Sequence, residues 1–324
     1  MAEVRYGKAI GNALAASLEK DPSVILLGED IAAAGGPFGV TKGLAEKYGE
    51  HRVLDTPISE AAIVGAAVGA ALSGLRPVVE IMFMDFMTLT MDALVNQAAK
   101  AHFMFGGQRP VPMVVRTPHG GGLNAGPQHS QCLEAWFAHV PGLKVVCPAT
   151  VADAYGLMIS AIEDPNPVIV VENKALYAMK GDLPDMPKAV PIGKGEIVRP
   201  GRDLTIVTYG AMVHSAQDAA RLLSEQKIDA EIIDLRSIQP WDEKLVLESL
   251  SRTHRLLVAQ EAVEAFGVGA EIAARMADIG FDELDAPIVR VGSPFMPIPF
   301  AKNLEAECRP NRDRLVAAAK KLLA

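Results

Sequence analysis

Short runs of apolar, often β-branched residues alternate along this chain with longer segments in which apolar residues recur at helical spacing. Ile10, Leu14 and Leu18 recur along one helix face and predict an amphipathic helix over Tyr6–Lys20. The run that follows, Val24–Gly28, is short and almost wholly apolar, as expected for a strand covered on both faces. Strands that alternate with longer helices are typical of parallel sheets with crossover helices, so the pattern predicts the α/β fold class.

The alternation continues on both sides of one break. Before the break, the pattern predicts helices over 60–74, 89–105 and 152–162 and strands over 76–81, 111–116, 144–147 and 167–172. Residues 179–191 contain three prolines without periodicity and are predicted to form a linker. Strands are then expected over 203–209, 229–235, 255–260 and 288–291, and helices over 210–226, 242–251, 267–279 and 312–323. We therefore expect two doubly wound domains, over 1–185 and 186–324.

Composition narrows the class of protein. Hydrophobic residues make up 50% of the 324 positions, which fits a large α/β core and also a large subunit interface. The net charge of −8 comes without a Lys/Arg cluster, so a nucleic-acid partner is not expected. Three cysteines without a CxxC pair suit a reducing compartment. No signal peptide is recognised, and the longest apolar stretch, 61–74, is too short to span a bilayer, so a cytoplasmic protein is expected.

Glu60 is the first candidate for chemistry. In the sequence Leu54-Asp-Thr-Pro-Ile-Ser-Glu60, a proline-containing turn follows a short strand and brings the carboxyl into the first turn of a helix. Ligands of doubly wound folds bind at this carboxyl edge of the sheet. A first-turn acid also complements the helix dipole without any other role. The spacing alone leaves both interpretations open.

Two further segments carry candidate residues. Phe86 lies in a Met- and Phe-rich stretch and either packs in the core or forms a face for a flat heterocycle. Polar side chains in the glycine-rich segment 116–131 are typical of a functional loop, where His129 either moves a proton or only bonds the loop. The spacing of His119, His129 and His139 matches no zinc motif. Cys132 is either a nucleophile with His129 as its base or an inert packed thiol.

Many motifs together resemble the β subunit of thiamine-diphosphate-dependent 2-oxo acid and acetoin dehydrogenases, in the transketolase-like superfamily. The resemblance covers essentially the whole chain. Its main motifs are Gly28-Glu-Asp, Gly36-Pro-Phe-Gly-Val-Thr-Lys-Gly43, Arg52-Val-Leu-Asp-Thr-Pro-Ile-Ser-Glu60, Gly74-Leu-Arg-Pro77, Asn96-Gln-Ala-Ala-Lys100, Gln128-His-Ser-Gln131, Asp234-Leu-Arg236, Pro240-Trp-Asp242 and Gly267-Val-Gly-Ala-Glu-Ile-Ala-Ala274.

The resemblance implies a pyrimidine-binding first domain, a transketolase-type C-terminal domain and roles for individual residues. Glu60 matches the acid that hydrogen-bonds the aminopyrimidine ring nitrogen of thiamine diphosphate, and Phe86 matches the aromatic that packs against that ring. His129 matches the histidine that assists acyl transfer to a lipoyl group. Further cofactor contacts are implied for Ile58, Met82 and Gln128. Some members also hold a potassium ion, largely by backbone carbonyls, at positions that match Met113, Ala161, Ile162, Asp164 and Asn166.

A missing motif implies a partner. The superfamily holds the diphosphate and magnesium with a Gly-Asp-Gly motif, which this sequence lacks. Magnesium is therefore expected on an α subunit in an α2β2 heterotetramer that serves a lipoyl-bearing acyltransferase. The small-molecule substrate stays open among acetoin, pyruvate and branched-chain 2-oxo acids, although Gly39 after Phe38 resembles the acetoin branch. The alternative is a scaffold subunit without chemistry of its own.

Overall fold

The computed structural model describes residues 2–324, and their contacts divide the chain into two compact units. The first unit extends to His119 and resumes over Trp136–Ile192; the second comprises Gly120–Ala135 and Gly193–Ala324. The residue pattern did not predict that Gly120–Ala135 would group with the second unit. The domain boundary predicted between residues 185 and 186 stays a prediction.

The first unit is built on a parallel sheet. Its strands lie in the order β6-β7-β5-β4-β2-β3 and all pair in parallel. Every residue of the central strands β5 and β7 is buried, as expected for strands covered on both faces. The bounds are β2 Val24–Gly28, β3 Val53–Asp55, β4 Arg76–Glu80, β5 Val114–His119, β6 Lys144–Val146 and β7 Val168–Asn173.

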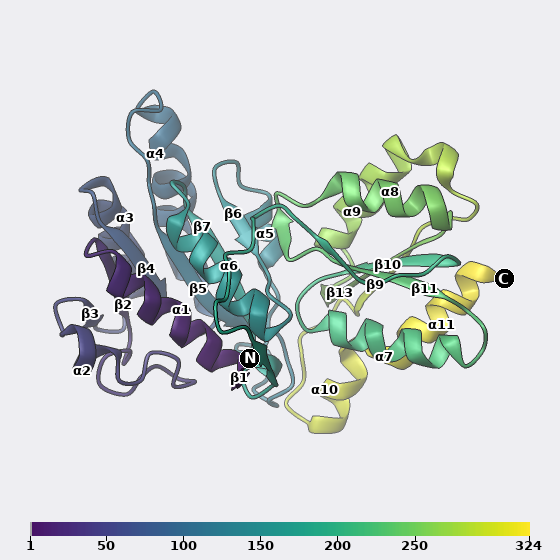
Figure 1. The fold of residues 1–324 in the computed structure, drawn as a ribbon, viewed down its shortest axis with the longest axis horizontal. Helices are drawn as coiled ribbons and strands as arrows, with labels where there is room; N and C mark the ends of the chain where they lie inside the picture. The colour runs from purple at the N-terminus through teal and green to yellow at the C-terminus, as the bar shows by residue number, and fades with distance from the viewer. Residues whose placement is uncertain (1) are drawn as a thin grey trace. The chain divides into compact units, whose positions relative to one another are not determined.

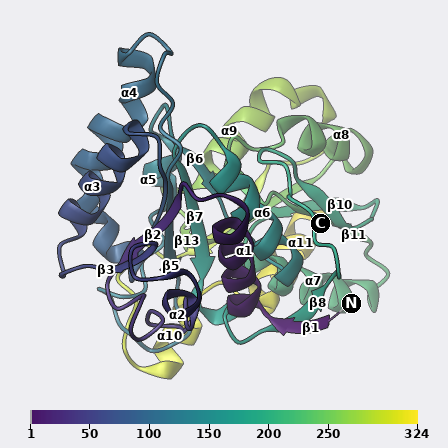
Figure 2. The same ribbon diagram turned by 60° about the vertical axis from the view of Figure 1, so that its left-hand side comes forward.

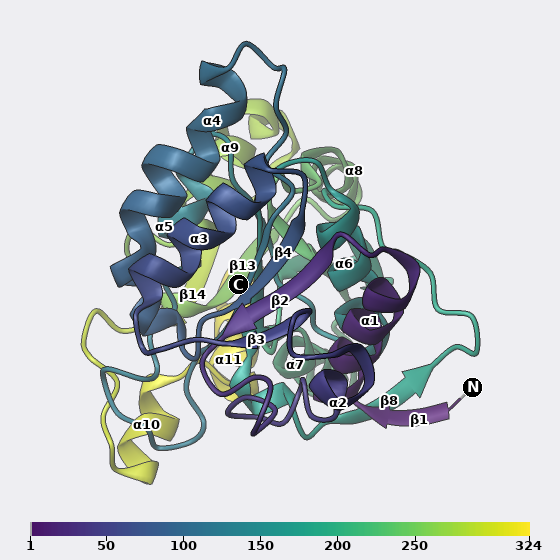
Figure 3. The same ribbon diagram turned by 90° about the vertical axis from the view of Figure 1, so that its left-hand side faces the viewer.

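Helices cover both faces of this sheet. α1 (Tyr6–Lys20) packs against α6 (Val151–Glu163) on one face, and α3 (Glu60–Leu72) lies on the other with η1, η2 and α4 (Figure 3). The arrangement confirms the predicted doubly wound α/β unit. It also places the carboxyl ends of the strands, and the loops that follow them, along one edge of the sheet.

The segment 89–105, predicted as one helix, spans parts of three successive helical elements. η1 (Met84–Thr90) is a 3₁₀-helix, η2 (Asp92–Ala98) is a π-helix and α4 (Ala99–Met104) is α-helical. Thr88 and Thr90 donate their hydroxyl hydrogens to the carbonyls of Asp85 and Met87, at 2.9 and 2.7 Å. Residues 89–104 are thus helical, as predicted, although the hydrogen-bond pattern of the helix changes along its length.

The predicted linker over 179–191 begins with a strand. β8 (Lys180–Leu183) pairs antiparallel with β1 (Ala2–Arg5), and the two lie side by side near the start of α1 (Figure 2). The prolines of this stretch all follow β8 or lie at its end, so they leave its backbone donors intact. A strand that depends on a partner 177 residues away leaves no local periodicity to detect.

The second unit contains a five-stranded sheet in the order β14-β13-β10-β11-β9, parallel except for β9 at its edge. α7 and α11 pack together on one face and α8 and α9 cover the other (Figure 1). The bounds are β9 Glu196–Arg199, β10 Leu204–Thr208, β11 Ala230–Asp234, β13 Leu256–Val263, β14 Val289–Ser293, α7 Met212–Ser224, α8 Glu243–Thr253, α9 Val268–Ile279 and α11 Arg312–Leu323.

Several short elements complete the chain. They are α2 (Leu44–Tyr48), α5 (Glu134–Ala138), η3 (Lys174–Leu176), β12 (Ser237–Gln239), η4 (Phe281–Glu283) and α10 (Lys302–Cys308). Elements this short carry too little periodicity to be predicted from a pattern. Over residues 2–324, no helix is both long and apolar enough to cross a membrane.

Candidate functional site

Glu60 opens α3 and is only 8% exposed. The turn before it follows β3, whose Asp55 accepts hydrogen bonds from the backbone N–H groups of Ala32 and Ala33 at 2.6 and 3.1 Å. These bonds tie the loop after β2 to the edge where α3 begins. The carboxyl of Glu60 itself has no hydrogen-bond partner within residues 2–324. A buried, unpartnered carboxylate carries a desolvation cost, which a ligand's donor would offset.

A second buried carboxyl interacts electrostatically with Glu60 and was missed by the sequence analysis. Glu29 follows β2, is 7% exposed, and its pKa is raised by burial and then by the negative charges of Glu60 and Asp30. Negative charges close to Glu29 disfavour its ionised form, which is the direction of this shift. The available signal was the Gly28-Glu-Asp sequence directly after an apolar strand, which places an acid at the same sheet edge as Glu60.

The aromatic candidate comes from an element that contacts α3. Phe86 lies on η1, which packs against α3, and its ring meets Phe83 edge-on with centroids 6.0 Å apart. Met82 is half-buried between β4 and η1, and Ile58 is 82% exposed in the turn before α3. A partly exposed ring thus comes from an element that packs on α3, and the exposed Ile58 lies in the turn just before that helix. This chemistry suits a flat heterocycle.

A buried cation links three strands of the same sheet. Arg116 of β5 donates from Nε and Nη2 to the two carboxylate oxygens of Glu172, at 2.8 and 2.6 Å, and from Nη1 to Glu80. Burial opposes the charge of Arg116, but the two carboxylates outweigh that effect and raise its pKa. Burial also raises the pKa of Glu80 to about 6, against the opposing charge of Arg116.

This cluster also fixes the loop between β2 and α2. Tyr177 donates its hydroxyl to Glu172 at 2.5 Å, and its ring stacks on Phe38 of the loop with centroids 4.4 Å apart. Gly36, with φ +75°, leaves room where a Cβ would lie 2.6 Å from Glu80 Oε1. Only glycine tolerates both the backbone angle and this approach. The loop that begins at Glu29 is therefore held against charged groups that are fully buried.

His129 lies on a loop that the second unit fixes at several points. Glu261 accepts a bond from the N–H of Gly121 at 2.9 Å, and Glu305 accepts bonds from Gly122 and Asn124 at 2.8 and 3.0 Å. Backbone bonds to carboxylates are among the stronger hydrogen bonds in proteins. His129 itself is half-buried, whereas its neighbour Gln128 is exposed.

A close contact completes the anchoring of this loop. A Cβ at Gly126 would lie 2.2 Å from the ring of Phe300, so no larger residue fits there without displacing the ring. Gly126 also has φ +74° and accepts a bond from the N–H of His129 at 3.3 Å. The sequence identified His129 but none of the anchors, because they come from β13, from α10 and from the segment just before α10, far along the chain.

Four of the predicted potassium ligands lie at or just after the end of α6, whereas Met113 directly precedes β5. Ile162 and Asp164 offer carbonyl oxygens, and both accept hydrogen bonds from Arg76 Nη1, at 2.7 and 3.4 Å. The carboxylate of Asp164 accepts bonds from Lys144 and from the N–H of Asn166, at 2.5 and 2.8 Å. Met113 and Ala161 are buried. Any cation bound here would share these oxygens with Arg76 and Lys144.

Two family models match the chain. "Transketolase, pyrimidine binding domain" matches residues 2–180, and "Transketolase, C-terminal domain" matches residues 193–315. Among solved structures, a chain described as "Split gene transketolase, inactive beta4 tetramer" superposes with a TM-score of 0.83 at 23% identity, over 99% of this chain and 98% of that one. At this identity the likeness supports the fold.

Curated relatives are closer in sequence. The beta subunit of acetoin:2,6-dichlorophenolindophenol oxidoreductase from Cupriavidus necator is 47% identical over 97% of this chain and 96% of its own. The protein of the same name from Bacillus subtilis is 45% identical over 99% and 97%. Subunit beta-2 of the mitochondrial pyruvate dehydrogenase E1 component of Oryza sativa is 45% identical over 98% and 86%.

Proposed function

This chain belongs to the family of transketolase-type dehydrogenase β subunits, and from that premise we propose that it forms half of a thiamine-diphosphate-dependent active site. With an α subunit it would decarboxylate a 2-oxo acid or cleave acetoin. The acyl group would then pass to the lipoyl group of a partner acyltransferase. The observation that carries this proposal is the buried Glu60 carboxyl at the start of α3, which has no partner within residues 2–324.

The residues present fit the aminopyrimidine half of the cofactor. The bound cofactor supplies a carbon nucleophile and an electron sink. The Glu60 carboxyl is available to hydrogen-bond a ring nitrogen and to hold or share a proton there. Ile58, Met82 and Phe86 provide apolar surface on the segments that border Glu60. Glu29 lies near enough to Glu60 to interact with it electrostatically, so a hydrogen-bond donor on a ligand is favoured beside these carboxyls.

His129 is proposed as the second functional residue, with a role in proton transfer. An imidazole donates or accepts a proton near neutral pH, and the backbone bonds to Glu261 and Glu305 hold the loop that carries it. Gln128 beside it is exposed and available to contact the cofactor or substrate. The magnesium and diphosphate ligands are assigned to the α subunit, since the sequence contains no Gly-Asp-Gly motif.

The substrate is proposed to be acetoin. Gly39 has φ +69° and no atom within 4 Å of the position its Cβ would occupy, so the loop leaves open space there. The relatives named for acetoin oxidation share 47% and 45% identity with this chain. Turnover of pyruvate or a branched-chain 2-oxo acid in preference to acetoin would overturn this assignment.

The direct test is Glu60→Gln in the α–β assembly, with thiamine diphosphate, magnesium and a dye as electron acceptor. We expect kcat to fall by roughly 10²–10⁴-fold, since the amide cannot exchange the proton that a carboxyl does. Glu46→Gln is the matched control, because Glu46 also lies in the first turn of a helix but is exposed. Gel filtration should show the same assembly for both variants. Wild-type turnover in Glu60→Gln would instead favour a scaffold subunit.

We also propose that potassium binds at the end of α6, through oxygens of Met113, Ala161, Ile162, Asp164 and Asn166. The support is the cluster of carbonyl and carboxylate oxygens there. Replacing potassium with tetramethylammonium should lower the melting temperature of the chain by a few degrees, whereas sodium should restore less of it. Equal melting temperatures in all three salts would remove this ion from the proposal.

A further inference from the structure

The second unit contains a cavity of about 540 Å³. It lies among the ends of β13 and β14, the turn that follows β14, and part of the segment that carries His129. Small-molecule sites in proteins typically measure roughly 300–1,000 Å³, so this cavity has the size of a ligand pocket. Of the residues given a role above, Gln128 lines this pocket, whereas Glu60, Phe86 and His129 do not.

The wall of the pocket is mainly apolar. Val263 lies at the end of β13, and the turn after β14 supplies Phe295, Met296, Pro297 and Ile298 in succession. Phe295 is 79% exposed, which is unusual for an aromatic side chain beside a cavity. Covering these side chains with an apolar ligand body would remove their surface from water.

The polar residues of the lining include a cation, Arg309, and a buried hydroxyl, that of Ser130. Arg309 donates from Nε to Glu261 at 2.8 Å, while its two terminal nitrogens make no hydrogen bond within residues 2–324. Burial opposes the charge of Arg309, but Glu261 outweighs it and raises the pKa, so the guanidinium stays cationic. The hydroxyl of Ser130 is buried and has no partner among the described residues.

The two carboxylates near this cation already accept hydrogen bonds from within the second unit. Glu261, which is 6% exposed, accepts from both Gly121 and Arg309. Glu305 accepts two backbone N–H groups. The pocket therefore offers unused donors beside an apolar wall, and a ligand that fits it must bring acceptors at one end.

We propose that this pocket binds a monocarboxylate with an extended apolar body. The carboxylate bonds the terminal nitrogens of Arg309, with Ser130 as a further partner, and the body lies against Phe295 and Met296. Arg309 would then lie between two carboxylates, the ligand's and that of Glu261. The first unit contains the same arrangement, in which Arg116 bridges Glu80 and Glu172.

Occupancy of the pocket would also act on the loop that carries His129. Gln128 and Ser130, the two neighbours of His129, both line the pocket. A ligand that contacts them favours one arrangement of the histidine between them. This coupling rests on the proposed function, whereas binding itself does not.

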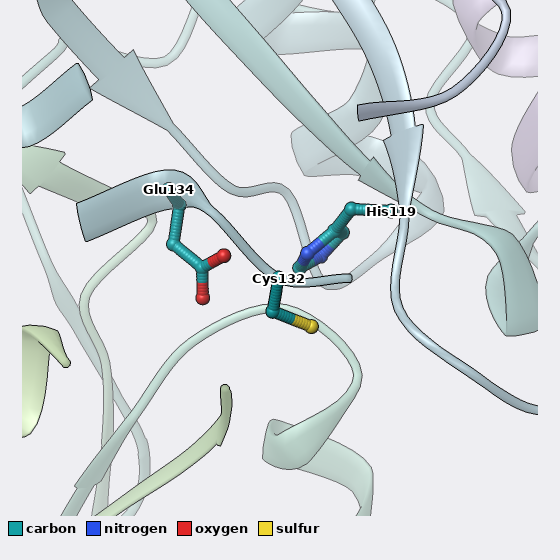
Figure 4. Close-up of side chains that lie close together, drawn as sticks. All are labelled: His119, Cys132 and Glu134. Atoms are coloured by element: carbon teal, nitrogen blue, oxygen red, sulfur yellow. The ribbon is translucent and has the colours of Figure 1, made fainter. Parts of the chain in front are cut away.

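The native thiol of Cys132 can serve as a probe of whether the pocket is occupied. Cys132 lines it and is half-buried, whereas Cys147 and Cys308 are buried. Figure 4 shows Cys132 on the same segment as Glu134, just before α5. The rate at which iodoacetamide alkylates Cys132, followed by peptide mass spectrometry, should therefore fall when the pocket is filled.

The test compares octanoate, octan-1-ol and butyrate on the full chain and on its assembly with the α subunit. Octanoate should slow alkylation of Cys132 at least tenfold at saturation. Octan-1-ol lacks the charge and butyrate lacks the apolar body, so each should protect far less. Equal protection by octan-1-ol would overturn carboxylate recognition, and no protection by octanoate in either preparation would overturn the site.

Variants test the contribution of Arg309 to ligand binding separately from that of the apolar wall. Arg309→Gln should weaken octanoate protection at least tenfold, while Arg312→Gln, an exposed arginine on α11, should leave it unchanged. Because Arg309→Gln also removes the bond to Glu261, its folding is checked by circular dichroism, and Ser130→Ala serves as a milder second variant. Full protection in a folded Arg309→Gln protein would refute the proposal. Acetoin turnover that octanoate leaves unchanged would refute only the coupling to His129.

Discussion

Arg116 shows how a single buried residue organises the first unit. Its side chain is 2% exposed, and it bonds carboxylates from the two strands on either side of its own. Removing one partner of such a group leaves an uncompensated buried charge, which typically costs roughly 3–5 kcal/mol. The strand register that places Glu80, Arg116 and Glu172 side by side is therefore specified by charge as well as by apolar packing.

The raised pKa of Glu80 makes the stability of the fold depend on pH. In the folded chain this pKa is about 6, against 4.5 for the unperturbed group, so the folded state holds the proton more tightly than the unfolded state. The resulting stabilisation amounts to about 2 kcal/mol. It is complete below about pH 4.5 and is lost as the pH rises through about 6. Above that pH the contribution is constant.

Glu80→Gln should abolish this dependence. The unfolding free energy of the variant, relative to wild type, should increase between pH 4.5 and pH 6.5, as measured by urea denaturation at each pH. Glu46→Gln, at an exposed position, provides the matched comparison. A difference between Glu80→Gln and wild type that stays constant over this range would show that Glu80 does not titrate there.

At the scale of elements, short segments far from His129 determine where its loop lies. α10 was not predicted from the sequence, because seven residues give no clear periodicity. Nevertheless it supplies Glu305, which is 3% exposed and accepts two backbone bonds from the loop. Glu305 is therefore a positioning residue for His129.

Glu305→Gln tests that role. An amide oxygen accepts a weaker bond than a carboxylate, by on the order of 1 kcal/mol, so we expect kcat to fall severalfold with a smaller change in KM. The pH profile of kcat should shift as well, because the environment of His129 changes. Glu307→Gln on the same helix is exposed and should behave as wild type. If the two variants have the same kcat and pH profile, the loop does not depend on Glu305.

For the whole molecule, the apolar composition has two sources. Large cores fill both units, and large apolar side chains also remain on the surface of the first unit, including Ile58 at 82% and Phe103 at 87% exposure. Exposed apolar side chains of this size suit a partner interface, so both interpretations of the composition, core and interface, remain in use.

We expect the chain to be inactive alone and active when mixed with an α subunit, because the sequence supplies no magnesium motif. Native mass spectrometry should show two copies of each chain in the active species. Hydrogen exchange should slow around Ile58 and Phe103 on mixing, relative to the exposed loop at Glu50. Full activity of the isolated chain would contradict a split active site.

The sequence by itself determined the alternating elements, the two α/β units and the family, because periodicity and contiguous motifs are local properties of the chain. It also identified Glu60, Phe86 and His129 as candidates, since each lies in a motif beside a strand or helix end. Helix limits that match the pattern, such as Tyr6–Lys20 and Arg312–Leu323, are those with a long amphipathic face.

Only the tertiary structure decided which distant residues meet. Glu29 and Glu60 come within electrostatic range because β2 and β3 pair in parallel, and Glu305 reaches the His129 loop across more than 180 residues of chain. The same holds for β8, which exists as a strand only through β1, and for the Arg309 pocket, whose walls come from four separate segments. Such groups are specified by packing and by the need to pair buried charge, neither of which leaves a periodic trace in the sequence.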